Sequence, residues 1–63
     1  MIKDYDKVRI KQSGIVGEVV DISTVNGKTI YTVESDEKDV PGGIGIDGYW
    51  KLFHCELSEL EKL

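Results

Sequence analysis

The sequence opens on a stretch in which polar and apolar side chains alternate. Within residues 6–11, Val8 and Ile10 occupy the apolar positions. The polar positions that alternate with them are Lys7, Arg9 and Lys11. A period of two is the pattern of a β-strand with one buried face, so this segment predicts a first strand. The residues that follow, at 12–14, form turns readily and end it.

Two segments rich in β-branched residues follow the first strand. Residues 15–22 and 29–34 contain mostly Val, Ile and Thr at their apolar positions and predict the second and third strands. The pair Asn26-Gly27 lies between them and is the strongest short signal for a tight hairpin, because both residue types tolerate positive φ. Gly17 lies inside the second segment and predicts a bulge or sharp bend, as a small barrel needs at a corner.

The second half of the chain is less regular. Residues 35–48 hold acidic residues, a proline and four glycines, which predicts a long exposed loop that Ile44 and Ile46 pin down through a short strand. The aromatic segment 49–55 predicts a fourth strand. Residues 56–63 leave two alternatives open, a helical turn or a 3-10 turn running into a short strand. The second is favoured, because eight residues make a marginal helix and a closing strand covers an open sheet edge.

Together these elements predict an all-β fold. It is a small, partly open SH3-like barrel of about five antiparallel strands, with a short 3-10 or helical turn near the C-terminus. A chain of 63 residues is one domain, which spans residues 1–63. A domain this short buries only about 60% of the surface that its unfolded chain exposes. A shallow binding surface suits such a domain better than a deep catalytic cleft, and we expect no enzyme activity.

The charge distribution and the cysteine content narrow the possible functions and the cellular location of the protein. The net charge of −4 is uneven, with +1 in residues 1–31 and −5 in residues 32–63. The broad basic field typical of nucleic-acid-binding proteins is therefore absent. A single cysteine, Cys55, excludes an internal disulfide. We expect a cytoplasmic protein with no membrane association, because no apolar run approaches the roughly 20 residues of a membrane span and residues 1–6 lack a signal-peptide core.

Several of these segments resemble a KOW-type SH3-like barrel. The resemblance lies in Asp-Lys-Val-Arg-Ile at 6–10, Gly-Ile-Val-Gly-Glu-Val-Val-Asp-Ile at 14–22 and Tyr-Thr-Val-Glu at 31–34. The Glu-Leu-Glu at 59–61 is similar to the ending of many short bacterial barrels of this kind. The resemblance covers residues 4–34 and implies contact with RNA, the ribosome or the transcription machinery. Other barrels of the type bind protein partners.

The adjacent His54 and Cys55 are the pair closest to a catalytic pattern. Neighbouring residues on a strand point to opposite faces, so these two side chains cannot converge into a dyad. One Cys and one His are too few ligands for zinc. The acidic loop residues lack the spacing of a calcium loop, and the glycines of 42–48 precede a strand instead of the helix that a phosphate loop needs. We therefore predict no catalytic residue, metal, cofactor or small-molecule substrate.

The aromatic segment is the most informative candidate binding surface. Strand alternation places Tyr49 and Phe53 on one face, and Trp50 and Leu52 on the other. If Leu52 is buried, Trp50 joins the core and the other two rings are exposed; the reverse arrangement stays open. Our first hypothesis is a non-catalytic module that binds a protein partner, which its acidic half would steer towards a basic surface. The candidate partner-binding residues are Tyr49, Phe53, Tyr31, Asp36, Glu37 and Asp39.

The second hypothesis is a nucleic-acid-binding module. Basic side chains on the first strand could contact phosphates, and Tyr31 could stack on a base. The candidate residues are Lys7, Arg9, Lys11 and Lys28. Lysines also protect strand edges from pairing with other chains, which gives the same pattern without any ligand.

Overall fold

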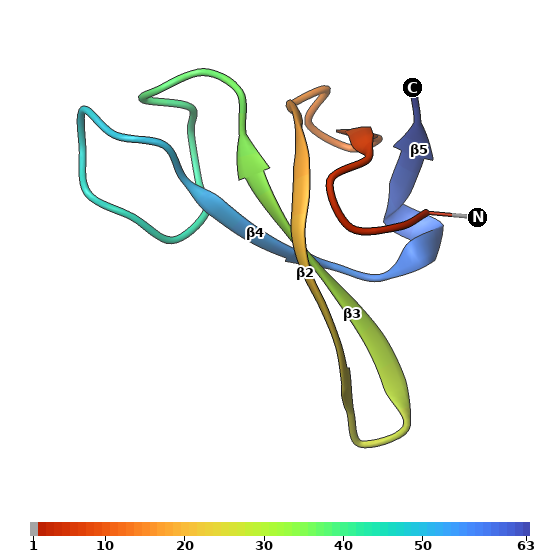
Figure 1. The fold of residues 1–63 in the computed structure, drawn as a ribbon. Coiled ribbons are helices and arrows are strands. Elements are labelled where there is room, and N and C mark those ends of the chain that lie inside the picture. The colour runs from red at the N-terminus through yellow and green to blue at the C-terminus, as the bar shows by residue number, and fades with distance from the viewer. Residues whose placement is uncertain (1) are drawn as a thin grey trace.

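The computed structural model describes residues 2–63 as five strands and one 3-10 turn. These are β1 (Lys7–Ile10), β2 (Val16–Val25), β3 (Lys28–Ser35), β4 (Leu52–Cys55), η1 (Leu57–Glu59) and β5 (Leu60–Lys62). The strands form one antiparallel sheet in the order β4-β3-β2-β1-β5, with β4 and β5 at its two edges (Figure 1). The predicted fold class is confirmed: an all-β domain with five antiparallel strands in an open sheet and a 3-10 turn near the C-terminus.

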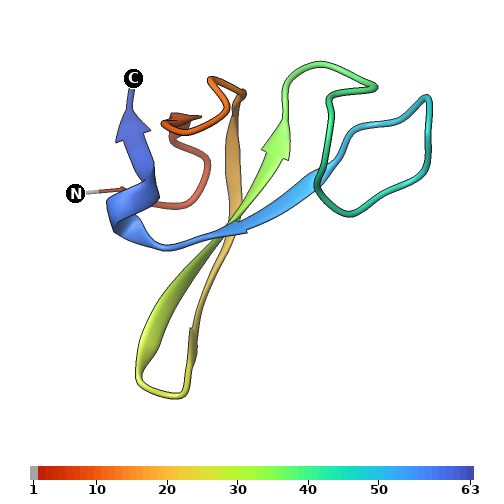
Figure 2. The same ribbon diagram turned by 180° about the vertical axis from the view of Figure 1, so that it is seen from behind.

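The hairpin of β2 and β3 is the longest feature of the sheet. Its turn is formed by Asn26 and Gly27, which have φ values of 50° and 79°, as the tight turn requires. The hairpin projects to one end of the molecule, and the loop between β3 and β4 lies towards the other end (Figures 1 and 2). The predicted hairpin is confirmed, although both strands extend further towards the turn than the β-branched segments indicated.

Gly17 has a different role from the predicted one. The register of β2 on β3 shifts between Val19 and Asp21, so the irregularity lies after Gly17 and not at it. At Gly17 itself, an added Cβ would lie 2.3 Å from the carbonyl oxygen of Glu34 and 2.7 Å from Cγ1 of Val33. Glycine is required there because β2 and β3 approach too closely for a side chain.

The core is formed by buried side chains from the strands of the sheet and from the N-terminal segment. Val8, Val19 and Val33 are fully buried at its centre, one from each of three neighbouring strands. The surrounding buried residues are Ile2, Ile10, Tyr31, Cys55 and Leu60, with Ile15, Ile22 and Phe53 packed against them. No helix within residues 2–63 is long and apolar enough to cross a membrane.

The C-terminal residues form a 3-10 turn that runs into a short strand, which is the second of the two predicted alternatives. η1 is a single turn in which the Glu56 amide donates to Oε1 of Glu59 at 2.8 Å, and the Glu59 amide donates to the Glu56 carbonyl at 3.0 Å. The chain then enters β5, which pairs with β1 and places Leu60 opposite Ile10. Leu60 is thereby buried, which explains why a short strand forms here instead of a longer helix.

β4 is shorter than the predicted strand. It begins at Leu52, so Tyr49 and Trp50 belong to the preceding loop. Both rings are exposed, at 57% and 46%, and Lys51 between them and the strand is buried instead. Neither predicted arrangement of the aromatic residues is therefore correct, because strand alternation does not extend to residues 49 and 50.

Candidate functional site

Within residues 2–63, the loop joining β3 to β4, residues 36–51, carries four of the eight large apolar side chains that face solvent. Ile44, Ile46, Tyr49 and Trp50 are all exposed on it. Lys38 places its amine 4.7 Å from the centroid of the Trp50 ring, which is a cation–π contact. We call these four apolar residues the loop surface. Exposed apolar groups of this kind are typical of interaction sites.

Ser35 closes the base of this loop. Its side chain is almost fully buried and its hydroxyl donates to the Glu37 carbonyl at 2.8 Å. The same hydroxyl accepts a hydrogen bond from the Lys51 amide at 3.0 Å, and the Ser35 amide donates to the Lys51 carbonyl at 2.9 Å. Ser35, the last residue of β3, is therefore bonded to Glu37 near the start of the loop and to Lys51 at its end.

Asp39 and Ile44 hold the interior of the loop. The Asp39 carboxylate accepts a hydrogen bond from the Gly48 amide, and the Asp39 amide donates to the Tyr49 carbonyl at 3.3 Å. Ile44 exchanges two main-chain bonds with Leu52, at 2.8 and 2.9 Å. The predicted long exposed loop is confirmed. The short strand expected at Ile44 and Ile46 is reduced to one bridge, and the Asp39 carboxylate is used to fold the loop.

Two glycines let the loop pack closely, one on β4 and the other on Lys51 just before β4. A Cβ at Gly45 would lie 2.9 Å from Cδ of Lys51, and one at Gly43 would lie 2.8 Å from Cζ of Phe53. The aliphatic part of Lys51 is thus covered by the loop, while its amine reaches the surface 3.7 Å from the Asp47 carboxylate. Close packing accounts for glycine at both positions, on β4 at Gly43 and on Lys51 just before β4 at Gly45.

Tyr31 and Phe53, the other aromatic residues predicted to contact a partner, are less exposed than expected. Tyr31 lies on the inner face of β3 and is buried, so the prediction that its ring is available to a partner or a base is wrong. Phe53 is half-buried and packs against the core. Of the predicted aromatic residues, Tyr49 alone is exposed, and Trp50 joins it from outside the predicted set.

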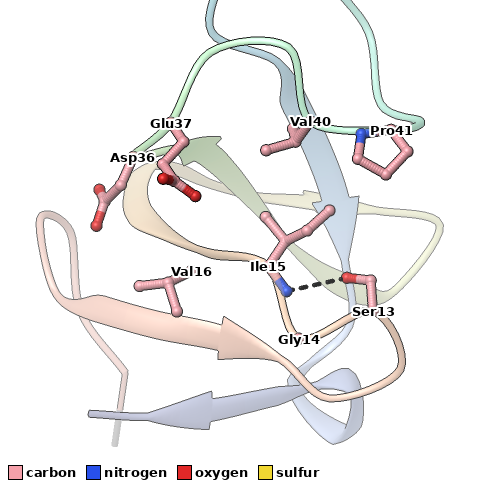
Figure 3. Close-up of a pocket in the computed structure, with 8 residues that line it drawn as sticks. All are labelled: Ser13, Gly14, Ile15, Val16, Asp36, Glu37, Val40 and Pro41. Carbon is pink, nitrogen blue, oxygen red and sulfur yellow. Dashed lines mark hydrogen bonds between the residues drawn. The ribbon is translucent and has the colours of Figure 1, made fainter.

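Two grooves flank the loop. The first has a volume of about 440 Å³ and lies between the turn after β1 and the beginning of the loop (Figure 3). It is lined by Ser13, Gly14, Ile15, Val16, Asp36, Glu37, Val40 and Pro41. The second, of about 420 Å³, lies between the same turn and β4, and Ser13 lines both. Asp36 and Glu37, two of the predicted partner-binding residues, thus share the first groove with Val40 and Pro41, which the sequence did not single out.

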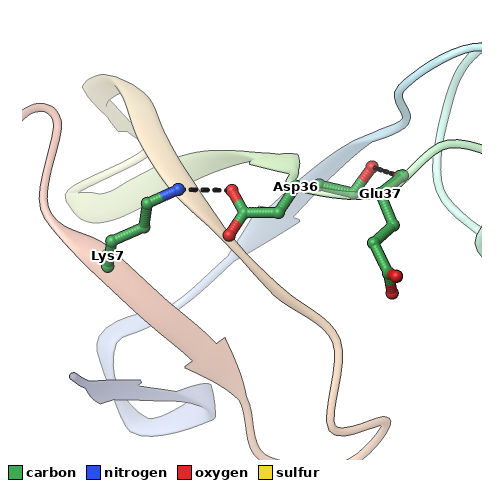
Figure 4. A network of polar contacts seen from close by, with 4 residues as sticks. Lys7, Asp36 and Glu37 are labelled. Atoms are coloured by element: carbon green, nitrogen blue, oxygen red, sulfur yellow. Dashed lines mark hydrogen bonds and ion pairs between the residues drawn. The ribbon is translucent and has the colours of Figure 1, made fainter.

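The predicted basic face is paired with carboxylates. The Lys7 amine lies 2.5 Å from Oδ1 of Asp36 (Figure 4), and this hydrogen bond raises the pKa of Lys7. Arg9 lies 2.8 Å from Oε1 of Glu61. The amine of Lys28 lies 3.9 Å from Oε2 of Glu56, while Lys11 makes no ion pair within residues 2–63. The acidic partners come from distant parts of the chain, so the sequence alone did not reveal them.

His54 and Cys55 occupy opposite sides of β4, as predicted from strand alternation. His54 is exposed, and Cys55 is buried in the core. Burial, with a smaller contribution from the nearby Glu59 carboxylate, raises the pKa of the Cys55 thiol. Within the described part of the chain, no group of three or more His, Cys, Asp or Glu residues could hold a metal ion.

The fold and its surface define a small all-β domain with an open five-stranded antiparallel sheet and an exposed apolar loop. Comparisons with protein-family models, with curated proteins and with solved structures find no match to this chain. The surface of the molecule is therefore the basis on which a function can be proposed.

Proposed function

We propose that this chain is a non-catalytic interaction module that binds a protein partner through the loop surface. The observation that carries the proposal is that Ile44, Ile46, Tyr49 and Trp50 are exposed on a loop held by its own hydrogen bonds. A loop already fixed in shape loses little conformational freedom on binding, so more of the contact energy contributes to affinity. Aromatic residues are also enriched in protein interfaces.

The charge distribution supports a basic partner. Five of the cationic side chains lie within 4 Å of a carboxylate of this same chain. They are Lys7, Arg9, Lys28, Lys51 and Lys62. Because the domain has twelve acidic and eight basic residues, several carboxylates within residues 2–63 remain without a cation. Such a surface attracts a positively charged partner and accelerates its association.

The nucleic-acid alternative follows from the KOW-type resemblance, but the site gives it less support. A phosphate would have to displace Asp36 from Lys7 and Glu61 from Arg9. Tyr31 is buried, which removes the ring expected to stack on a base. The protein-binding proposal requires no such rearrangement.

A selection from a random peptide library tests the proposal. Peptides displayed on phage are selected on the immobilised domain and then measured against the double variant Ile46→Asp, Tyr49→Ala. Both side chains are exposed, so we expect the variant to keep the fold, which its amide NMR spectrum verifies. We expect selected peptides to bind the variant about tenfold or more weakly. Equal binding to both proteins would overturn the proposal.

A titration with short RNA and DNA at low salt tests the alternative. If the alternative holds, amide shifts gather at residues 7–11 and 28 and disappear with added salt, because phosphate contacts release counterions. Substituting Arg9→Glu would then abolish the shifts, whereas peptide binding through the loop surface would tolerate that substitution.

A further inference from the structure

The first groove combines an apolar lining with charge of one sign. Figure 3 shows the Asp36 and Glu37 carboxylates on one side, Val40 and Pro41 on the other, and Ile15 between them. No basic side chain lines this groove. An apolar trough with acidic groups at one side matches a long side chain with an aliphatic stem and a positive head.

The two carboxylates are not equivalent. Asp36 is engaged by Lys7, as Figure 4 shows. Within residues 2–63, the Glu37 carboxylate makes no hydrogen bond or ion pair; only its main-chain carbonyl is used, by Ser35. The groove thus has one neutralised carboxylate and one that is available to a cation.

Hydrogen bonds hold the Asp36 side of the groove and the turn at Ile15 before any ligand arrives. The Asp36 amide donates to the Val16 carbonyl at 3.0 Å, which joins the two sides. On the turn, the Ile15 amide donates to Oγ of Ser13 at 3.2 Å, and the Ile15 carbonyl accepts from the Ile10 amide at 2.8 Å. A preformed groove binds its ligand with little ordering cost.

We propose that this groove takes one Lys or Arg side chain of the partner protein, with its aliphatic stem along Ile15, Val16 and Val40 and its cation at Glu37. This inference rests on the proposed function, since it names the chemistry of the partner residue that docks beside the loop surface. The contact between Lys7 and Asp36 is an example of the same recognition within the chain. The acidic side of the groove repels phosphate, so it disfavours nucleic acid and anionic lipid as occupants.

The test uses two tripeptides that differ in charge and hardly in shape. Acetyl-Gly-Arg-Gly-amide and its citrulline counterpart are titrated into the isotope-labelled full chain, and amide shifts are followed by NMR. We expect the arginine peptide to shift residues 14–16, 37 and 40. We expect the citrulline peptide to bind about threefold or more weakly, because it cannot pair with Glu37.

Two variants with equal net charge provide the control. Glu37→Gln should weaken binding of the arginine peptide about threefold, and Asp21→Asn, which removes an exposed carboxylate from β2 outside the groove, should not. Equal weakening by both variants, equal binding of both peptides, or shifts confined to other residues would each overturn the inference. If the inference fails but library peptides still bind through the loop surface, the proposed function stands. If instead the tripeptide binds as expected but no library peptide depends on the loop surface, the proposed function fails.

Discussion

The buried hydroxyl of Ser35 accepts a hydrogen bond from the main-chain amide of Lys51, 16 positions further along the chain. Through this bond the last residue of β3 holds the residue immediately before β4. The loop is therefore anchored where it leaves β3 and where it enters the neighbouring strand β4. The ends of the loop depend on this one side chain, while Asp39 and Ile44 hold its interior.

We expect Ser35→Ala to destabilise the domain by about 1–3 kcal/mol, because it leaves the Lys51 amide and the Glu37 carbonyl without their partner. Urea unfolding followed by Trp50 fluorescence measures the change. The matched control is Ser58→Ala, at an exposed serine of η1, which should change the free energy of unfolding by less than about 0.5 kcal/mol. Equal stability of the two variants would show that the Ser35 hydroxyl does not hold the loop.

We expect Gly17→Ala to destabilise the domain by about 1–3 kcal/mol, since the new methyl group meets the Glu34 carbonyl and Val33. Its amide spectrum should show displaced signals for residues 33–35 of the neighbouring strand. Gly14→Ala is the comparison, because Gly14 has φ 78° but open space around it. That variant should lose about 1 kcal/mol through backbone strain alone, with β3 unshifted. An undisturbed β3 in the Gly17 variant would contradict the close approach.

The Asp6 carboxylate makes the stability of the folded domain depend on pH in the acid range. The Lys3 amide donates to its carboxylate at 2.9 Å and lowers its pKa below 3.8, and Lys62 contributes a smaller lowering. Because the pKa is lower in the folded state, ionised Asp6 stabilises the fold above the unfolded value, and this contribution is lost as the pH falls through the folded pKa. Asp6→Asn should therefore be less stable than the wild type near neutral pH and should converge with it in acid. A carboxyl titration by NMR with a midpoint at or above 3.8 would contradict this.

The Cys55 thiol should react slowly in the folded domain. It is buried, and its pKa is raised above 9.0, so the thiolate that attacks disulfide reagents is scarce. Because the pKa is higher in the folded state, stability should fall as the pH rises above the unfolded value of 9.0. The rate of reaction with an aromatic disulfide, measured in buffer and in urea, tests the first expectation. Rates within twofold of each other would show that the thiol is accessible.

Features that depend on neighbouring residues could be predicted from the sequence. The alternation of Val8 and Ile10 identified β1, and Asn26-Gly27 identified the hairpin, because a turn of this kind is determined by the residues within it. The 3-10 turn and short last strand were also predicted. β1 and the hairpin are each encoded within a few adjacent residues, whereas β5 also depends on its pairing with β1.

Features that depend on distant residues could not be predicted from the sequence. β4 starts at Leu52, and Lys51 just before it is bonded to Ser35 on another strand. Alternation along residues 49–55 therefore did not predict that Trp50 is exposed together with Tyr49. The pairing of Lys7 with Asp36 likewise requires knowledge of which strands are adjacent. The candidate site was predicted in part: the loop and its acidic residues were identified, whereas the exposure of Trp50 and the groove beside Asp36 depend on tertiary packing.

The position of β1 in the sheet has a consequence for the order of folding. Its neighbour on one side, β2, follows directly in sequence, but its neighbour on the other side, β5, supplies Glu61 to Arg9 across 52 positions. Closing so long a loop is slow compared with forming a hairpin, so we expect β5 to join the sheet last. Until it does, one edge of β1 can pair with another molecule. The charge of Arg9, whose partner Glu61 arrives only with β5, opposes such aggregation.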